Sequence, residues 1–322
     1  MKILVTGAAG FIGSKLAYSL AKRGDEVLGI DNFNDYYDVR LKEARCKEFG
    51  LNVLKIDIAD KPALDALFEK EHFDKVVNLA AQAGVRYSIT NPYAYLQSNM
   101  VGFLNILEAC RNNGVRHLVY ASSSSVYGLN AKVPYSEDDK VDNPVSLYAA
   151  TKKSNELMAH AYCKLYGISM TGLRFFTVYG PWGRPDMSPM LFAGAISRGE
   201  PIKVFNGGDM IRDFTYIDDI VEGTIGCIDH EPEPNENGLR YRVYNIGCSH
   251  PVKLMDFIHE IEVAMGTEAR KVFLPMQPGD VYQTNADTTK LEQEIGYKPH
   301  VRLHEGIAQF AAWYNSEKNP LC

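Results

Sequence analysis

The first half of the chain alternates short apolar runs with longer amphipathic stretches. Apolar, β-branched runs predict strands at residues 2–6, 26–30, 53–56, 75–79, 117–121 and 168–174. Apolar positions three and four apart predict helices at residues 11–22, 36–48, 61–70, 93–113 and 147–166. Strands that alternate with helices in this way predict an α/β fold with a doubly wound parallel sheet, covered by helices on both faces.

The second half is less regular. Gly180-Pro181-Trp182-Gly183-Arg184-Pro185 follows the sixth strand, and Gly and Pro recur at 199–208, 232–238 and 275–279. Such punctuation predicts a smaller, mixed α/β lobe. We therefore expect a first domain over residues 1–175 and a second over 176–322, with segments around 212–246 packing back on the first domain.

Composition excludes several classes of protein. Of the 322 residues, 46% are hydrophobic and 23% are charged, which is typical of a globular domain rather than a disordered chain. The net charge of −6 gives no general attraction to nucleic acid. No apolar run reaches the roughly 18 residues of a membrane-spanning helix. The six cysteines form no CxxC pair, so we expect free thiols and a cytoplasmic protein.

The histidines indicate no metal site. His300 and His304 have a helical ligand spacing, but Pro299 precedes them and no acidic motif accompanies them. We therefore expect no metal ion.

A glycine pattern joins the first strand to the first helix. Gly7, Gly10 and Gly13 allow a tight turn and close backbone approach to a pyrophosphate, which the helix N-terminus attracts. Asp31 ends the second strand, where a carboxylate accepts both ribose hydroxyls and repels a 2′-phosphate. These features predict a Rossmann-type site that prefers NAD to NADP. A ligand-free strand–helix turn, and an Asp that merely starts a turn, are the alternatives.

Tyr148 and Lys152 form a Y-x-x-x-K pattern that places both side chains on one helix face. A nearby ammonium and a positive nicotinamide ring both favour the phenolate, so Tyr148 can exchange a proton with a sugar hydroxyl. Residues 122–125 are serines that follow the fifth strand, where a hydroxyl can share a substrate oxygen with the tyrosine. A polar turn and a half-buried helix face are the alternative interpretations.

Together, G-x-x-G-x-x-G, S-S-S-x-V-Y-G and Y-x-x-x-K resemble the extended short-chain dehydrogenase/reductases that act on nucleotide sugars, over essentially the whole chain. The resemblance implies tightly bound NAD, regenerated in each turnover, and a C-terminal lobe that holds the nucleoside diphosphate. It also implies that Ser123, Tyr148 and Lys152 are the catalytic residues.

Two sets of binding residues follow from the motifs and the resemblance. The expected cofactor contacts are Gly7, Gly10, Phe11, Ile12, Gly13, Asp31, Asn32, Asp57, Ile58, Leu79, Ala80, Ala81, Asn99, Ser122, Tyr148, Lys152, Phe175 and Val178. The expected substrate contacts are Arg86, Ser123, Ser124, Tyr148, Thr177, Arg184, Val204, Phe205, Arg212 and Asp280.

The serine segment narrows the reaction. Dehydratases of this family carry Asp-Glu before Val-Tyr-Gly, and decarboxylases typically carry Glu at the second position, whereas this chain has Ser124-Ser125. The missing carboxylates favour simple 4-epimerisation: transient oxidation at C4, rotation of the 4-keto sugar and reduction on its opposite face.

Residues 31–37 and 174–187 are similar to UDP-glucuronate 4-epimerases. Oxidised glucuronate is a β-keto acid that loses carbon dioxide unless its carboxylate is held. Ser123, Ser124, Thr177 and Arg184 are the candidates to hold it, and Arg184 is able to bind it bidentately. A surface-loop arginine is the alternative interpretation of Arg184.

The resemblance also places the nucleotide. Arg212 matches the diphosphate contact, although it could instead pair with neighbouring carboxylates. Val204 and Phe205 are expected beside the uracil, and Pro278-Gly279-Asp280 matches the nucleoside-ribose loop. Many relatives have an arginine just before that loop, where this chain has Met276-Gln277, so Arg86 is the candidate for the second positive charge.

Other functions remain open from the sequence. The chain could epimerise neutral UDP-sugars, such as UDP-glucose or UDP-N-acetylglucosamine, or it could be a noncatalytic NAD-binding regulator. The family suggests a homodimer through helices 93–113 and 147–166 and a role in polysaccharide biosynthesis. However, the apolar residues of these helices could equally face the sheet; examples are Leu104, Leu107, Leu157 and Met158.

Overall fold

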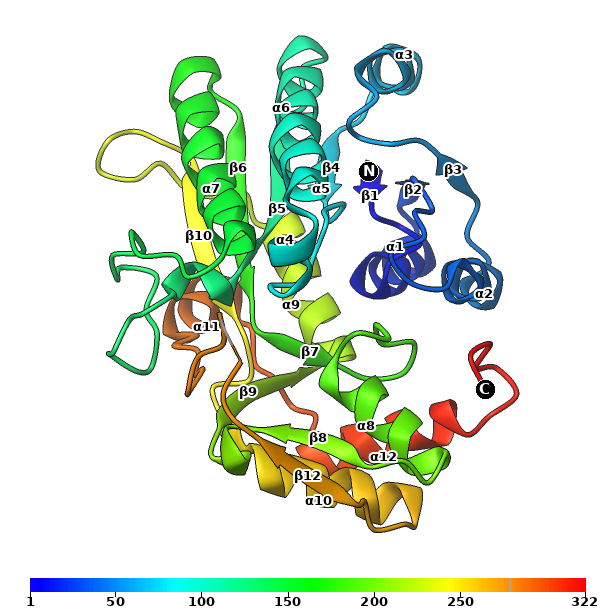
Figure 1. Cartoon of the computed structure of the whole chain (residues 1–322). Coiled ribbons are helices and arrows are strands. Elements are labelled where there is room, and N and C mark those ends of the chain that lie inside the picture. The colour runs from blue at the N-terminus through cyan, green and yellow to red at the C-terminus, as the bar shows by residue number, and fades with distance from the viewer. Residues whose placement is uncertain (278) are drawn as a thin grey trace.

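Seven parallel strands form the central sheet of the computed structural model, which describes residues 1–277 and 279–322 (Figure 1). The strand order is β10-β6-β5-β4-β1-β2-β3. The bounds are β1 (Lys2–Thr6), β2 (Glu26–Asp31), β3 (Val53–Lys55), β4 (Lys75–Asn78), β5 (His117–Ser123), β6 (Ser169–Phe175) and β10 (Tyr241–Ile246). The order reverses between β1 and β4, so a crevice opens at their carboxyl ends. The predicted α/β doubly wound fold is confirmed.

Helices cover both faces of this sheet because each buries one apolar stripe against it. Leu16 and Ile220 belong to the core on one face, and Phe68 and Ile106 to the core on the other. The first face carries α1 (Phe11–Arg23), α2 (Val39–Phe49) and α9 (Ile217–Asp229); the second carries α3 (Lys61–Glu71), α6 (Phe103–Asn112) and α7 (Leu147–Tyr166). Helix α9 thus returns from the second half of the chain to pack on α1 (Figure 1).

The helix expected over residues 93–113 is present, but its hydrogen-bonding type changes along its length. It consists of α5 (Pro92–Tyr95), a π-helix η1 (Leu96–Gly102) and α6. The side-chain amide of Asn155 on α7 donates to the main-chain carbonyl of Asn99 at 2.6 Å. Because this bond takes an acceptor from the helix ladder, it favours the wider π turn at this point.

The smaller lobe begins directly after β6. One sheet contains β7 (Thr177–Tyr179), β9 (Ile211–Tyr216) and β11 (Pro251–Lys253), and a second pairs β8 (Ile202–Phe205) with β12 (Lys271–Leu274). Its helices are α8 (Ser188–Ser197), α10 (Leu254–Met265) and α12 (Leu303–Tyr314), whereas α11 (Thr289–Ile295) packs against α9 and against β10 of the main sheet. Phe214 and Phe257 stack with ring centroids 3.8 Å apart and join β9 to α10. The lobe therefore has aromatic packing of its own next to the carboxyl edge of the main sheet.

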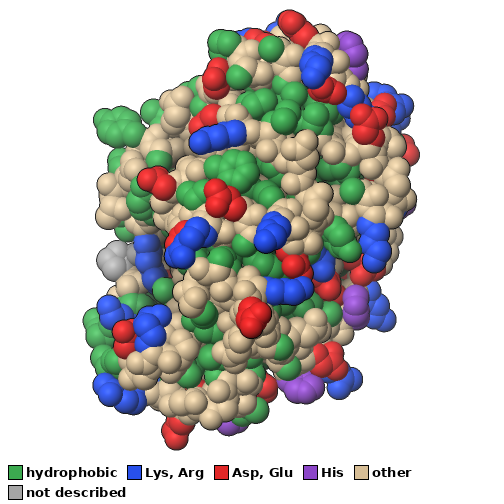
Figure 2. All heavy atoms as spheres, turned by 90° about the vertical axis from the view of Figure 1, so that its right-hand side faces the viewer, with side chains coloured by type: hydrophobic (Ala, Val, Ile, Leu, Met, Phe, Trp, Pro, Cys, Tyr) green, Lys and Arg blue, Asp and Glu red, His purple; other side chains and the backbone are tan. Residues whose placement is uncertain are grey.

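On the face shown in Figure 2, acidic and basic side chains are interspersed among apolar ones. Among the described residues, no helix is both long and apolar enough to cross a membrane.

Candidate active site

The glycine loop sits where β1 passes into α1. Gly7 has φ +70°, and a Cβ added to it would come 2.8 Å from the Ala80 nitrogen. A Cβ on Gly13 would come 2.1 Å from the Gly7 carbonyl oxygen, so both positions require glycine. The N-cap residue Gly10 offers no side chain to cap α1. The first-turn amides are therefore left to an external anion, which fits the pyrophosphate of a dinucleotide.

The expected ribose contact lies on the neighbouring strand. Asp31 ends β2, is 7% exposed, and accepts a hydrogen bond from the Phe33 amide at 2.8 Å. The Lys42 ammonium lies 3.3 Å from the same carboxylate oxygen. At the end of β3, Asp57 accepts from the side-chain amide of Asn32 at 2.9 Å. The carboxyl ends of adjacent strands thus bring together residues that the sequence predicts for NAD.

Two of the expected catalytic groups lie close together. Ser123 is the last residue of β5, and Tyr148 lies near the start of α7. The Ser125 hydroxyl donates a hydrogen bond to the Ser123 hydroxyl at 2.9 Å. Burial raises the pKa of Tyr148, and the nearby Ser123 hydroxyl and the charge of Arg184 oppose this rise. The structure therefore presents a protonated phenol and a serine at the same point of the pocket.

Lys152 lies one helical turn from Tyr148 and is 3% exposed. Its ammonium donates to the carbonyl of Ala121 at 2.8 Å, and burial lowers its pKa to about 8. The ammonium form therefore still predominates near neutral pH, but by much less than in an exposed lysine. Burial, Ser123, Arg184 and Asp186 shift the pKa of Tyr148 here, and Lys152 is not among these influences.

Beneath these residues lies a buried polar network that the sequence did not predict. Glu156 on α7 accepts two bonds from the Arg174 guanidinium, at 2.8 and 2.9 Å, and one from the Ser122 hydroxyl at 2.7 Å. Arg174 in turn donates to the Tyr127 hydroxyl at 3.0 Å. The network connects α7 to the ends of β5 and β6, and so restrains the position of Tyr148 relative to the sheet. Ser122, expected at the cofactor, already uses its hydroxyl here.

Arg184 lies close to Tyr148. Its guanidinium binds Asp186 through two bonds, of 3.0 and 2.6 Å, and the Tyr36 hydroxyl donates to the same carboxylate at 3.0 Å. The charge of Arg184 is close enough to lower the pKa of Tyr148. Asp186 and Tyr36 were missed by sequence reasoning, because Tyr36 comes from a distant loop and Asp186 from an irregular one. The spacing of Arg184 and Asp186 was the only available signal.

The expected nucleotide contacts meet at Asp280. Arg212 reaches its carboxylate at 3.0 Å and Arg86 reaches it at 3.7 Å. The Arg86 guanidinium also lies over the Phe205 ring, 5.2 Å from its centroid. Val204 is fully buried. Two cations, one carboxylate and an aromatic ring therefore lie together, whereas Pro278 lies outside the described residues.

The remaining predicted residues differ in what they can still contact. Asn99 is 1% exposed and bonds to the backbone of Gln82 and to the Thr151 hydroxyl. Ser124 and Thr177 are partly exposed, so their hydroxyls are accessible. The side chains of Phe175 and Val178 are buried at the end of β6 and in β7.

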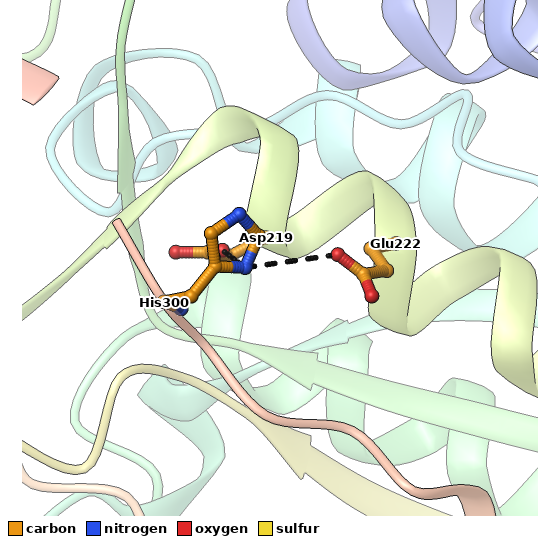
Figure 3. A group of neighbouring side chains, drawn as sticks. All are labelled: Asp219, Glu222 and His300. Carbon is orange, nitrogen blue, oxygen red and sulfur yellow. Dashed lines mark hydrogen bonds and ion pairs between the residues drawn. The ribbon is translucent and has the colours of Figure 1, made fainter.

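His300 has acidic neighbours that its own segment of sequence does not reveal. Figure 3 shows it against Asp219 and Glu222, two residues of α9 whose carboxylates point to the imidazole. The Nδ1 atom of the His300 ring lies 3.0 Å from an Asp219 carboxylate oxygen, and Asp219 accepts hydrogen bonds from the His300 and Val301 amides at 3.1 and 3.2 Å. His304 lies inside α12, whereas His300 precedes that helix, so the two do not share a helical face. The cluster fastens the segment before α12 to α9.

Known proteins share both the sequence and the fold. Residues 3–247 match the model of the NAD dependent epimerase/dehydratase family. UDP-glucuronate 4-epimerase 3 of Arabidopsis thaliana is 48% identical over 97% of this chain and 76% of its own length.

Two solved structures are similarly close. The UDP-glucuronic acid 4-epimerase of Bacillus cereus, solved with UDP-glucuronic acid and NAD, is 36% identical, with TM-score 0.89 over 97% of this chain and 98% of its own. The UDP-glucose 4-epimerase of Thermotoga maritima, solved with UDP-glucose, is 29% identical, with TM-score 0.88 over 98% of both chains. The predicted resemblance is confirmed, and the chain belongs to the NAD-dependent epimerase/dehydratase family.

Proposed function

We propose that this protein interconverts UDP-glucuronate and UDP-galacturonate by epimerisation at C4. Bound NAD supplies a reversible hydride acceptor. The residues of the chain bind the sugar, move one proton and hold the carboxylate. Relatives that carry the name UDP-glucuronate 4-epimerase support this assignment, as does the arrangement of the cleft.

Tyr148 is proposed to take the proton from the C4 hydroxyl and to return it after the sugar has turned. Ser123 supports this role because its hydroxyl is close enough to the phenol to lower the pKa of Tyr148, so both groups can share one substrate oxygen. Ser124 and Ser125 offer no carboxyl group for elimination or decarboxylation. The protein then has one proton acceptor and no second acid, as reversible epimerisation requires.

The position of Arg184 is the observation that carries the choice of a uronic acid. Arg184 places a cation beside Tyr148. Its guanidinium donates to Asp186 through Nε and Nη2. The Nη1 donors face no hydrogen-bond acceptor among the described residues and are available to a second carboxylate. Holding that group fixed relative to the C4 carbonyl protects the β-keto acid from loss of carbon dioxide.

The UDP moiety is assigned to the opposite end of the cleft. Arg212 and Arg86 supply two positive charges beside Asp280, and Phe205 supplies an aromatic face. Arg86 thereby compensates for the arginine that this chain lacks at Met276-Gln277. In this proposal, residues 176–322 hold the nucleotide sugar and residues 1–175 hold NAD.

Substrate competition tests the assignment. Purified protein without added NAD is incubated with UDP-glucuronate, UDP-glucose or UDP-N-acetylglucosamine, and the products are separated by chromatography. We expect equilibration of UDP-glucuronate with UDP-galacturonate and no turnover of the neutral sugars. Turnover of a neutral sugar without turnover of the acid would contradict the proposal.

A homodimer is proposed through the outer faces of η1, α6 and α7. Leu104 and Leu157 are 40% and 60% exposed, and Leu165, on the same helix as Leu157, is 67% exposed. Leu107, in contrast, is fully buried against the sheet. An exposed apolar face of this extent on two adjacent helices is typical of a subunit interface.

We also propose that the protein works in the cytoplasm and supplies galacturonate units for polysaccharide synthesis. The proposed reaction needs NAD and a UDP-sugar, and its product is an activated sugar suited to a glycosyltransferase. Cell fractionation, together with analysis of surface sugars in a deletion strain, tests both statements.

A further inference from the structure

The carboxylate that faces the cofactor ribose has a buried cation of its own. Lys42 lies on α2, is 5% exposed, and approaches Asp31 to 3.3 Å and the side-chain oxygen of Asn34 to 3.2 Å. Its ammonium also lies 5.4 Å from the centre of the Tyr37 ring. Burying a lysine is costly unless its charge is compensated. Asp31 supplies this compensating charge, so the two residues form a buried ion pair at the carboxyl end of β2.

A second cation lies one turn further along α2. Arg45 is fully buried, and it bonds to the carbonyls of Trp182 and Ala9 and to the Tyr37 hydroxyl. None of its hydrogen bonds goes to a carboxylate. The other acid at this edge, Asp57, bonds to Asn32 and to the Ala59 amide rather than to Lys42. Among the residues that the structure describes, Asp31 is thus the carboxylate that pairs with the Lys42 ammonium.

We infer that Lys42 is a latent ligand for a 2′-phosphate, and that the preference for NAD depends on the single charge of Asp31. A ribose hydroxyl that donates to Asp31 lies about 3 Å from its carboxylate. A phosphate on that oxygen comes within reach of the Lys42 ammonium, whose four-carbon stem is flexible. In the native chain the carboxylate repels this phosphate and occupies the lysine.

Replacing Asp31 by a neutral residue then removes the repulsion of the phosphate and also frees the Lys42 ammonium. Asn keeps an acceptor for the Phe33 amide, so the turn after β2 is preserved. Lys42 keeps its bond to Asn34, so its charge stays in place. The site gains a net positive charge where the 2′-phosphate fits.

Nucleotide content tests this inference without reference to sugar turnover. Wild type, Asp31→Asn, Lys42→Met and the double variant are produced in cells that contain both NAD and NADP. The protein is denatured, and the released dinucleotides are quantified by chromatography. We expect the ratio of bound NADP to NAD to rise at least about tenfold in Asp31→Asn and to fall back in the double variant. Lys42→Met alone should retain NAD.

Two outcomes overturn the inference: an Asp31→Asn protein that carries NAD alone, or single and double variants with the same ratio. A variant that purifies without dinucleotide is titrated with NADH and NADPH by fluorescence and judged by the same ratio of affinities. Circular dichroism and thermal unfolding check that each variant is folded. Should Asp31→Asn fail to fold, Asp31→Ser takes its place, because it also removes the charge and leaves Lys42.

Discussion

Tyr148 is by itself a poor base, because burial raises its pKa and keeps the phenol protonated. Lys152 by itself is protonated less completely than an exposed lysine, because burial lowers its pKa to about 8. Each group changes the other only when a ligand closes the site and brings further charge. At the scale of single residues, reactivity is therefore a property of the pair with its ligand.

Removing the phenol oxygen should separate cofactor binding from turnover. In Tyr148→Phe the ring keeps its edge contact with Tyr95, whose centroid is 6.0 Å away, but the proton acceptor is lost. We expect kcat to fall by about 10²–10⁴-fold, with bound NAD unchanged. Product analysis and nucleotide release measure the two effects. Tyr166→Phe, at the exposed end of the same helix, is the control, and retained activity in Tyr148→Phe would remove that residue from its role.

His117 should make stability depend on pH. Burial lowers its pKa from 6.5 to about 3. Below pH 6.5 this histidine therefore binds a proton in the unfolded chain but stays neutral in the folded chain. Stability from this residue is therefore intact above pH 6.5 and is lost as the pH falls, by about 1.4 kcal/mol per unit. Between pH 7.5 and pH 5 the loss is about 2 kcal/mol.

Urea unfolding of wild type and His117→Gln at these two pH values measures this loss. Glutamine is neutral throughout, so the variant should lose less stability on acidification, although it also weakens the contact with Thr171. An equal loss in both proteins would mean that His117 does not titrate on unfolding.

At the scale of elements, local sequence patterns predict single strands and helices, whereas contacts between distant elements are not visible in them. Periodicity predicted the strands β1 to β6 and the helix α7 to within two residues. It did not predict the π-helix η1, because the bond that takes the Asn99 carbonyl comes from Asn155 on another helix. Nor did it place Asp219 and His300 together, since they belong to separate elements.

The attachment of α9 to the segment before α12 can be tested through Asp219. This carboxylate is 1% exposed and accepts two backbone amides, so Asp219→Ala leaves two buried donors without acceptors. We expect a loss of about 1–3 kcal/mol in the free energy of unfolding. Glu222→Ala is the matched control, because its side chain is 68% exposed and reaches only His300, at 3.8 Å. Equal losses in the two variants would show that the amide contacts contribute nothing.

At the scale of the whole molecule, the outer surface of α7 decides assembly. Leu157→Asp places a charge in the proposed interface, and we expect a monomer of 36.0 kDa where wild type has twice that mass. Val263→Asp is the control, since Val263 is similarly exposed, at 64%, on α10 of the smaller lobe. Light scattering after size-exclusion chromatography gives the masses. A dimeric Leu157→Asp protein would place the interface elsewhere.

The sequence by itself determined the sheet, the glycine loop and the placement of Tyr148 and Lys152 one turn apart on the same helix. These features depend on residues close together along the chain, whose spacing is read directly as a strand, a turn or one face of a helix. It also placed Asp31 at the end of its strand.

Only the tertiary structure decided what surrounds these residues. It brought Ser123 close to Tyr148, set Asp186 and Tyr36 against Arg184, and placed Lys42 beside Asp31. Such contacts depend on how strands and helices pack, and burial then sets which groups stay charged. Spacing along the chain carries no record of either.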